Sequence, residues 1–467
     1  MKNFVLVPDA LVVAGALAVL LLGRARRRPR WWMPVAAAAV TLVALAVELW
    51  AGAAVSTYFG GALVQDRFAL FAKAAVLLAA TLAIAVTDWS DEDAPAIGIS
   101  MVLIAAFGAM VVASAGDFVG LWAGLELAAV AGVVLVSARR TDLGLRLLVV
   151  GGVASALVLI GLAFVYASTG SADLLTVRRA IVVSGPTLPL AIPVLLLLGG
   201  LAVRAGVPPF QFARVPISLG ASPLGAGLVI GLVAVAALTV ALKIAGALSP
   251  VPALLSPYLM VLAAVAMVGG GAAALATRSP RARLAYLAAG QVGWVVAGLA
   301  THYRSGLGSS LFLLGAFALA ATTGPAVMGG ADAGEFALAG MATVRPARAA
   351  GIALVFLSLA GAPPLAGFFG EFAVAASLAQ AHVFWLLALG GLGAAMSVAA
   401  AVGTVRAIYL QNPPDDSRRA AGARLPPLTR LSTIGALALC VLIAGYGLFG
   451  NPILSLADQG AEALGLR

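Results

Sequence analysis

Six ionisable side chains stand inside long apolar stretches of this chain, where a charge is costly to bury. They are Glu48, Lys73, Glu126, Arg204, Lys243 and Glu371. Glu48 and Lys243 lie nearer the ends of their stretches, so their side chains could extend to the membrane surface. The other four lie near the middle and are candidates for ion or proton binding, because charges within a membrane are rare and usually functional.

Glu126 and Arg204 form a candidate ion pair. Glu126 lies midway along its apolar stretch, and Arg204 lies just before a Gly-Val-Pro-Pro sequence that should interrupt a helix. Opposite charges on neighbouring helices lower the cost of burying either one. Two interpretations stay open: the pair fixes how the helices pack, or it takes part in an ion or proton route.

Glu371 and Lys73 have no partner that the sequence reveals. A lone carboxylate at this depth could exchange a proton near neutral pH, or a partner subunit could neutralise it. For Lys73, a structural pair and a place in a polar axis are both open. Four uncharged polar residues are expected to make helix-packing contacts instead. They are Gln211, Tyr286, Gln291 and Ser358.

Few side chains of this chain could bind a metal ion or a redox cofactor. Cys440 is the single cysteine, which excludes disulfides within the chain and a cysteine-ligated cluster. The two histidines, His302 and His382, lie at the edges of apolar stretches, so we expect no metal cage and no haem ligation. We also expect no strands, and hence no Gly-rich phosphate loop after one. The sequence therefore predicts no metal site, no catalytic residues and no bound cofactor.

The apolar composition sets the class of protein. Hydrophobic residues make up 63% of the 467 residues and charged residues 10%, and the mean hydropathy is +1.09. Unbroken apolar runs have the length of spanning helices, about twenty residues, rather than the short alternating pattern of barrel strands. We predict an all-α integral membrane protein with about fourteen spans. The runs cover residues 4–23, 31–53, 66–87, 95–115, 117–138, 144–167, 187–207, 222–247, 257–276, 282–300, 306–328, 349–378, 383–409 and 429–449.

Basic residues predict the orientation. They follow the first, fifth, seventh, ninth, eleventh and thirteenth runs, whereas the opposite loops carry few. By the positive-inside rule these loops are cytoplasmic and both termini lie outside. The net charge of +10 is spread over many short loops, which argues against nucleic-acid binding. The basic residues are Arg24, Arg26, Arg27, Arg28, Arg30, Arg139, Arg140, Arg214, Arg278, Arg281, Arg283, Arg345, Arg348, Arg418, Arg419 and Arg424.

Two Pro-Pro sequences, each preceded by a glycine, predict broken helices in the seventh and twelfth spans. Proline removes a helix hydrogen bond and clashes with the preceding turn. The two spans are five apart, an odd number, so they run in opposite directions. Paired broken helices in oppositely oriented halves are typical of inverted-repeat transporters. The breaks are centred on Pro208, Pro209, Pro363 and Pro364.

The breaks suggest a division of the chain into four parts. Residues 1–94 form an N-terminal three-helix segment, and residues 95–248 form a first five-helix repeat. Residues 249–410 form the second, inverted repeat. Residues 411–467 hold a polar linker, at 411–428, and a C-terminal helix.

Five segments resemble a known family. They are Asp66–Lys73, Gly120–Leu127, Gly200–Phe210, Arg283–Tyr286 and Ser358–Gly370. In this order and spacing they are similar to membrane subunit N of the proton-translocating NADH:quinone oxidoreductases (respiratory complex I), and more distantly to subunits of multi-subunit cation/proton antiporters. The resemblance implies two proton half-channels joined by a central axis of buried charges. It also implies that quinone, flavin and iron–sulfur clusters belong to partner subunits.

The chain departs from the family at the axis. Glu126 matches the family's glutamate on span five, but Arg204 stands at the lysine position of span seven and Glu371 at that of span twelve. Residues 231–237 of span eight are apolar where a lysine is expected, and Gln211 and Gln291 replace histidines. Arginine is effectively always protonated, so it cannot release a proton during a cycle as lysine can. The departures indicate a subunit kept for assembly and electrostatic continuity, with reduced or lost proton conduction.

Three functions follow from these observations. The first is an N-type subunit of a complex I-like NADH:quinone oxidoreductase, a translocase whose redox centres lie elsewhere. The second is a subunit of a cation/proton antiporter, and the third is a non-pumping structural membrane subunit. Expected partners are other membrane subunits, the lipid bilayer and protons. Arginine outnumbers lysine 25 to 3 (28 basic residues less Lys2, Lys73 and Lys243), which suggests a high-GC bacterium and its cytoplasmic (inner) membrane.

Overall fold

The computed structural model describes residues 5–24, 32–51, 55–89, 95–184, 189–330, 338–412 and 430–464. Most of the predicted basic connection after the first span lies outside these residues. The predicted polar linker lies outside them too, except for its first two residues, Gln411 and Asn412.

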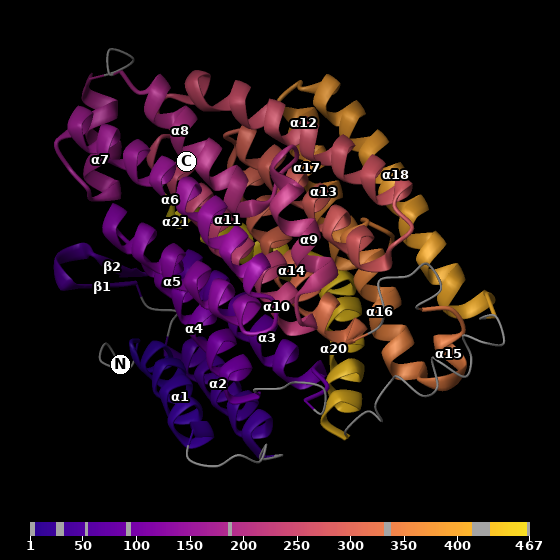
Figure 1. Ribbon diagram of the computed structural model, residues 1–467. Helices are drawn as coiled ribbons and strands as arrows, with labels where there is room; N and C mark the ends of the chain where they lie inside the picture. Colours follow the sequence, from indigo (N-terminus) through magenta and orange to yellow (C-terminus); the bar gives the residue numbers. More distant parts are fainter. Residues whose placement is uncertain are drawn as a thin grey trace.

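Within the described residues, eleven helices are long and apolar enough to cross a membrane (Figure 1). These are α2 (Trp32–Ala51), α3 (Arg67–Val86), α4 (Pro95–Ser114), α5 (Phe118–Ser137), α6 (Thr141–Thr169), the continuous helix Pro223–Ala247, α12 (Pro252–Ala276), α13 (Pro280–Ala300), α14 (Arg304–Met328), α18 (Phe384–Leu410) and α20 (Arg430–Leu448). The predicted class, an all-α membrane protein, is confirmed.

Three shorter apolar helices correspond to the first, seventh and twelfth predicted spans. They are α1 (Val7–Arg24), α8 (Ala191–Ala205) and α16 (Pro346–Leu359), and α16 is followed after a break by α17 (Ala366–Gln380). Together with the eleven long helices they match the predicted runs one for one. The total of fourteen crossings stays a prediction.

The expectation of no strands is wrong. A two-stranded antiparallel hairpin, β1 (Ser56–Tyr58) and β2 (Leu63–Gln65), joins α2 to α3. Its turn uses left-handed backbone at Phe59, Gly60 and Gly61, which two glycines tolerate readily. Strands of three residues leave no signal in a hydropathy profile, and this is why the sequence does not predict them.

Several short elements lie between or after the spanning helices. Two of them, α7 and α21, have an apolar and a polar face and were not predicted. The short elements are η2 (Phe59–Gly61), α7 (Leu174–Ser184), η4 (Phe210–Ala213), α9 (Arg214–Gly220), α15 (Met341–Val344) and α21 (Gly450–Ala463). The helix Pro223–Ala247 is itself made of α10 (Pro223–Gly227), a π-helical turn η5 (Leu228–Leu232) and α11 (Val233–Ala247).

The core is centred on the helix Pro223–Ala247 and on α14, whose best spanning windows are 100% buried within the protein. By contrast only about a third of the corresponding window is buried in α18 and α20. Figure 1 shows α11 and α14 in the middle of the bundle, with α1, α2 and α18 at its edges. A side chain on the central helices therefore meets only protein, so any charge there needs a partner inside the bundle.

The first predicted break is confirmed at the end of α8. Gly206 has left-handed backbone, with φ of 70°, and its N–H donates to Val203 O at 3.2 Å. The N–H of Val207 donates to Ala202 O at 3.0 Å. These two bonds form a Schellman motif, which satisfies carbonyls that would otherwise be orphaned where the helix stops.

The second break, at the end of α16, has the same geometry. Gly361 has φ of 73° and donates to Ser358 O at 3.2 Å, and Ala362 donates to Leu357 O at 2.9 Å. At both breaks the motif is followed by a cis Pro-Pro peptide bond. Two helices far apart in the sequence thus end with the same hydrogen bonds at corresponding positions, as expected for a repeat.

Candidate charge axis within the bundle

The predicted ion pair between Glu126 and Arg204 is present. Arg204 Nη2, on α8, lies 2.7 Å from Glu126 Oε1 and 2.9 Å from Oε2, on α5. Ser155 of α6 hydrogen-bonds to both side chains, a contact that the sequence did not predict. Gly151, one turn before Ser155, leaves room for the guanidinium, because a Cβ there would lie 3.0 Å from Arg204 Nη1. Three helices therefore converge on this pair.

Arg204 also lies in the last turn of α8, directly before the break. The carbonyl end of a helix carries partial negative charge and favours a cation. Arg204 is only 7% exposed, and the pair with Glu126 and the helix end together lower the cost of burying it.

Arg214 was predicted to lie in a cytoplasmic loop, and this is wrong. Its side chain is buried and donates to two backbone carbonyls, Arg204 O and, at 3.3 Å, Ile230 O. It covers Gly206, where any Cβ would collide with the arginine side chain. The chain turns back into the protein after the break, which brings Arg214 beneath the end of α8. An arginine five residues beyond the Pro-Pro pair was the available signal, because it can cap the freed carbonyls.

Glu371 occupies the corresponding place at the second break. It is 6% exposed, it lies on α17, and its carboxylate packs against Gly361 as Arg214 packs against Gly206. Among the described residues its carboxylate makes no hydrogen bond and no ion pair, consistent with the lone carboxylate that the sequence predicts. The two breaks therefore carry opposite kinds of ionisable group at equivalent positions.

Gln291 contacts the second break from α13. Its Nε2 donates to Ser358 O at 3.3 Å, a helix-packing contact of the expected kind. Its Oε1 is buried and has no partner among the described residues, as is also true of Gln211 Oε1 near the first break. Both amides thus keep one acceptor free beside a broken helix.

The helix Pro223–Ala247 packs tightly on α14 over the segment where the resemblance leads us to expect a lysine. Gly227 and Gly231 pack against Thr322, and a Cβ on either would fall well inside contact distance of α14. Residues 228–238 are all apolar and buried. Close helix approach, made possible by the glycines, takes up the space that a long side chain would need.

A small cavity lies between the first break and α13. Its volume is about 10 Å³, and Gln211, Arg214 and Phe317 are among the residues that line it. A single water needs about this much space.

Glu48 and Lys243, whose side chains could have extended to the membrane surface, are both buried within the protein. Glu48 is 1% exposed and accepts a hydrogen bond from Gln65 Nε2 at 2.6 Å. Lys243 is 4% exposed, and its Nζ donates to Ala115 O at 2.6 Å. Both residues are enclosed because the hairpin and neighbouring helices cover the ends of their own helices.

Lys73 forms an ion pair. Its Nζ lies 2.8 Å from Asp9 Oδ2, a residue of α1 that the sequence analysis did not single out. The predicted site residues thus fall into three groups: Glu126 with Arg204, Glu371 alone, and the lysines near the N-terminal helices.

The bundle, its two broken helices and its buried ion pair define a multi-pass, antiporter-like membrane protein. The family model "NADH:quinone oxidoreductase/Mrp antiporter, TM" matches residues 115–397. The NADH-quinone oxidoreductase subunit N 1 of Rhizobium meliloti is 28% identical, over 97% of this chain and 96% of that protein. The chain belongs to this family, and the resemblance to subunit N is confirmed.

Solved structures show the same fold. A chain of respiratory complex I from Thermus thermophilus is 24% identical, with a TM-score of 0.79 over 97% of this chain and 99% of that one. A chain of the Mrp complex from Dietzia sp. is 20% identical, with a TM-score of 0.80 over 99% and 98%. Complex I and Mrp chains match equally well, so the fold alone does not separate these two assemblies.

Proposed function

We propose that this chain is the N-type membrane subunit of a redox-driven NADH:quinone oxidoreductase, and that its charge axis transmits electrostatic changes without carrying protons end to end. The first part rests on relatives named as subunit N, among them one from Geobacillus kaustophilus that is 32% identical over 81% of this chain. Quinone, flavin and iron–sulfur clusters then belong to partner subunits, and this chain supplies membrane helices.

The second part rests on one observation, the fixed arginines at the first break. Arg204 is held by Glu126 and Ser155, and Arg214 is held by two carbonyls. A proton carrier must bind and release its proton during each cycle, and arginine does not. The closed packing at Gly227 and Gly231 supports the same conclusion for span eight.

Glu371 is the group on the far side of this barrier that can exchange a proton. It stands alone beside the second break, so binding a proton there changes the local charge by one unit. Such a change alters the field at Gln291 and the helix end without requiring a water chain to the first break. Glu371 would thus respond to events in a neighbouring subunit.

The proton-to-electron ratio of the parent complex tests this function. Vesicles containing the purified complex would be compared for wild type, Glu371→Gln and Arg204→Ala at matched electron-transfer rates. We expect an unchanged ratio in an assembled complex. A fall in the ratio would show that proton pumping depends on the side chains at these two positions.

A cation/proton antiporter subunit is the second candidate, favoured by the fold shared with the Dietzia Mrp chain. Co-purification separates the two. Iron–sulfur proteins and quinone reduction in the purified complex support the first function, whereas small membrane subunits alone support the second. In either case we place the chain in a bacterial cytoplasmic membrane with both termini outside.

A further inference from the structure

A second buried polar cluster lies in the N-terminal helices, apart from the Glu126–Arg204 pair. It consists of Asp9 of α1, Glu48 of α2, Gln65 of β2 and Lys73 of α3, and we call it the N-terminal cluster. Two contacts join its members in pairs: Lys73 Nζ lies 2.8 Å from Asp9 Oδ2, and Gln65 Nε2 donates to Glu48 Oε1 at 2.6 Å. Its residues precede the segment that the family model matches.

Two oxygen atoms of the cluster have no donor among the described residues. They are Glu48 Oε2 and Gln65 Oε1, and both side chains are at most 2% exposed. Leaving a buried acceptor unpaired costs about 1–3 kcal/mol, so native proteins rarely keep two side by side. A proton bound to Glu48 would turn one of its two acceptor oxygens into a donor.

Counting the charges gives the same result. Asp9 and Lys73 act electrostatically on Glu48, and Asp66 and Lys73 act on Lys243. Five ionisable groups therefore act on one another: Asp9, Glu48, Asp66, Lys73 and Lys243. If all five were ionised, three carboxylates would face two ammonium groups, a net charge of −1. One bound proton makes the set neutral, which avoids an uncompensated charge in the protein interior.

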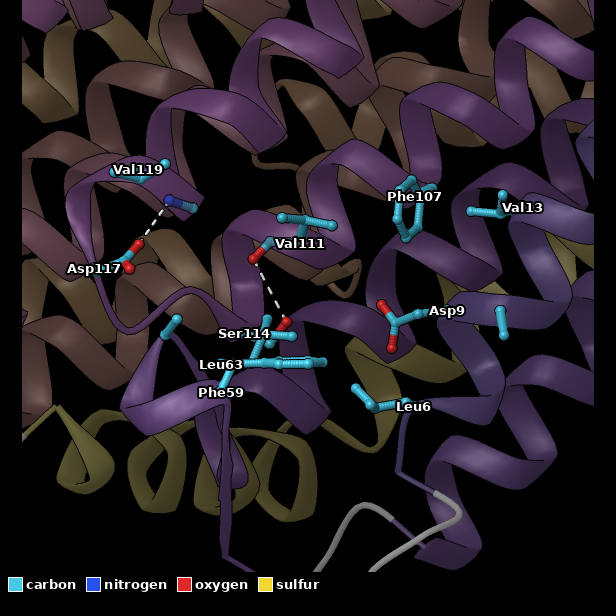
Figure 2. A pocket seen from close by; sticks show the side chains of 13 residues that line it. Leu6, Asp9, Val13, Phe59, Leu63, Phe107, Val111, Ser114, Asp117 and Val119 are labelled. Carbon is cyan, nitrogen blue, oxygen red and sulfur yellow. Dashed lines mark hydrogen bonds between the residues drawn. The ribbon is translucent and has the colours of Figure 1, made fainter.

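The cluster reaches a cavity through Asp9. The cavity has a volume of about 550 Å³ and a mostly apolar lining, in which Asp9, Ser114 and Asp117 are the polar side chains that could hold water. Figure 2 shows the Asp9 carboxylate among the lining side chains of Leu6, Val13 and Phe107. Asp9 is 13% exposed, more than Glu48 or Lys73, so it connects the cluster to this space.

We propose that the N-terminal cluster binds one exchangeable proton, shared by Glu48 and Asp9 across Lys73 and exchanged with water in the cavity at Asp9. Before the transfer, Lys73 pairs with Asp9 and the proton resides on Glu48. Lys73 then gives a proton to Asp9, and its flexible stem carries the amine from Asp9 to Glu48, where it takes the proton of Glu48. The ammonium is restored, and the net change is one proton moved from Glu48 to Asp9, which releases it to the cavity.

Infrared difference spectroscopy of the full chain in its membrane complex tests the site. At neutral pH we expect one carboxylic-acid carbonyl band that is lost in Glu48→Gln and also in Asp9→Asn, because either change leaves the cluster neutral without a proton. The band should shift quickly on transfer to deuterated water. Asp142→Asn is the control, since Asp142 is an exposed carboxylate paired with Arg140, and this variant should keep the band.

Lys73→Gln should add a carbonyl band, whereas Glu48→Gln and Asp9→Asn should remove one. Removing the ammonium leaves one more uncompensated carboxylate, so a second carbonyl band should appear. Loss of the band in Glu48→Gln but not in Asp9→Asn would overturn the shared proton, and so would a band that neither variant alters. A band abolished by sodium at constant pH would assign the site to a metal cation instead. Any carbonyl band of Glu371 is separate and is altered only by Glu371→Gln. The proton site in the N-terminal cluster can therefore be disproved without affecting the proposed function, which concerns Glu371 and the first break.

Discussion

At the residue scale, two arginines lie at the first break, and their contacts show what they do there. The guanidinium of Arg204 reaches two carboxylate oxygens of Glu126 and the hydroxyl of Ser155. Arg214 spreads its donors over two backbone carbonyls. A planar group with five donors can make several bonds at once, whereas an ammonium group offers three donors on a flexible stem. These residues therefore hold helices together at the first break.

Removing one partner of the buried pair should be more harmful than removing both. Glu126→Gln leaves Arg204 buried close to Arg214 with no anion, and we expect a loss of about 3 kcal/mol in stability. The double variant Glu126→Gln with Arg204→Gln should recover part of this loss. Thermal unfolding of the detergent-solubilised chain measures both.

Arg140→Gln serves as the control for this comparison. Arg140 pairs with Asp142 at the surface, and surface pairs contribute little to stability. A single variant at Glu126 that is no less stable than the double variant would show that the pair does not compensate for burial.

At the element scale, the two breaks place ionisable groups inside the protein. Each helix ends on a left-handed glycine with a Schellman motif, and the next charged side chain folds over that glycine. The absence of a Cβ serves two purposes at this position: it permits the backbone conformation and it leaves room for Arg214 or Glu371. A continuous helix would hold neither side chain in this place.

Gly206→Ala should therefore destabilise the chain by roughly 1–3 kcal/mol, from left-handed strain and from collision with Arg214. Gly199→Ala, in the same helix, is the matched control, because a Cβ there meets nothing within 4 Å. Replacing a glycine within a helix favours folding by up to about 1 kcal/mol, so this variant should be stabilised. Thermal unfolding of the two variants side by side gives the comparison, and equal midpoints would contradict it.

The C-terminal helix α21 ties distant elements together on one face of the bundle. Arg67 at the start of α3 donates to Gln459 Oε1 at 2.6 Å, and Arg304 at the start of α14 pairs with Glu462. Arg178 of α7 donates to the carbonyl of Leu464 at 3.1 Å. Three charged contacts thus fix α21 across helices that belong to different parts of the chain.

Asp458 opposes this docking at neutral pH. Its Oδ1 is buried without a partner among the described residues, and burial raises the pKa of the carboxyl group. Because the docked state binds the proton more tightly than the undocked state, docking weakens as pH rises through the raised pKa. Asp458→Asn should slow hydrogen exchange in α21 at neutral pH and have no effect in acid. A larger effect of Asp458→Asn on hydrogen exchange in acid than at neutral pH would contradict a raised pKa of Asp458.

At the scale of the whole molecule, the central helices are enclosed by protein while the outer ones expose apolar side chains. Val149 and Val153 of α6 are 66% and 59% exposed, and Leu392 of α18 is 53% exposed. Faces of this kind suit lipid or partner subunits, because water cannot hydrate them without cost. The orientation of the bundle then depends on which loops carry the basic residues.

Cysteine labelling tests that orientation. In a Cys440→Ser background, Tyr303→Cys places a thiol in the loop between α13 and α14, and Asp142→Cys places one at the start of α6; both positions are exposed. A membrane-impermeant maleimide should label Tyr303→Cys in intact cells. Asp142→Cys should react only after permeabilisation. The reverse pattern would invert the proposed topology.

The sequence by itself determined the membrane class, the apolar runs, both helix breaks and the candidacy of Glu126 and Arg204 as a pair. These properties are local, because hydropathy decides the solvent and proline decides where a helix stops. It did not reveal the β-hairpin, whose strands are too short to leave a pattern.

Only the tertiary structure decided which buried charges meet. Lys73 and Asp9 are 64 residues apart in the chain, and Arg204 and Glu126 are 78 apart. Basic residues near a helix end look alike in sequence whether they face water or protein, which is why Arg214 was misplaced. Packing between distant helices fixes such contacts, because a buried charge needs a partner and the folded bundle decides which group lies next to it.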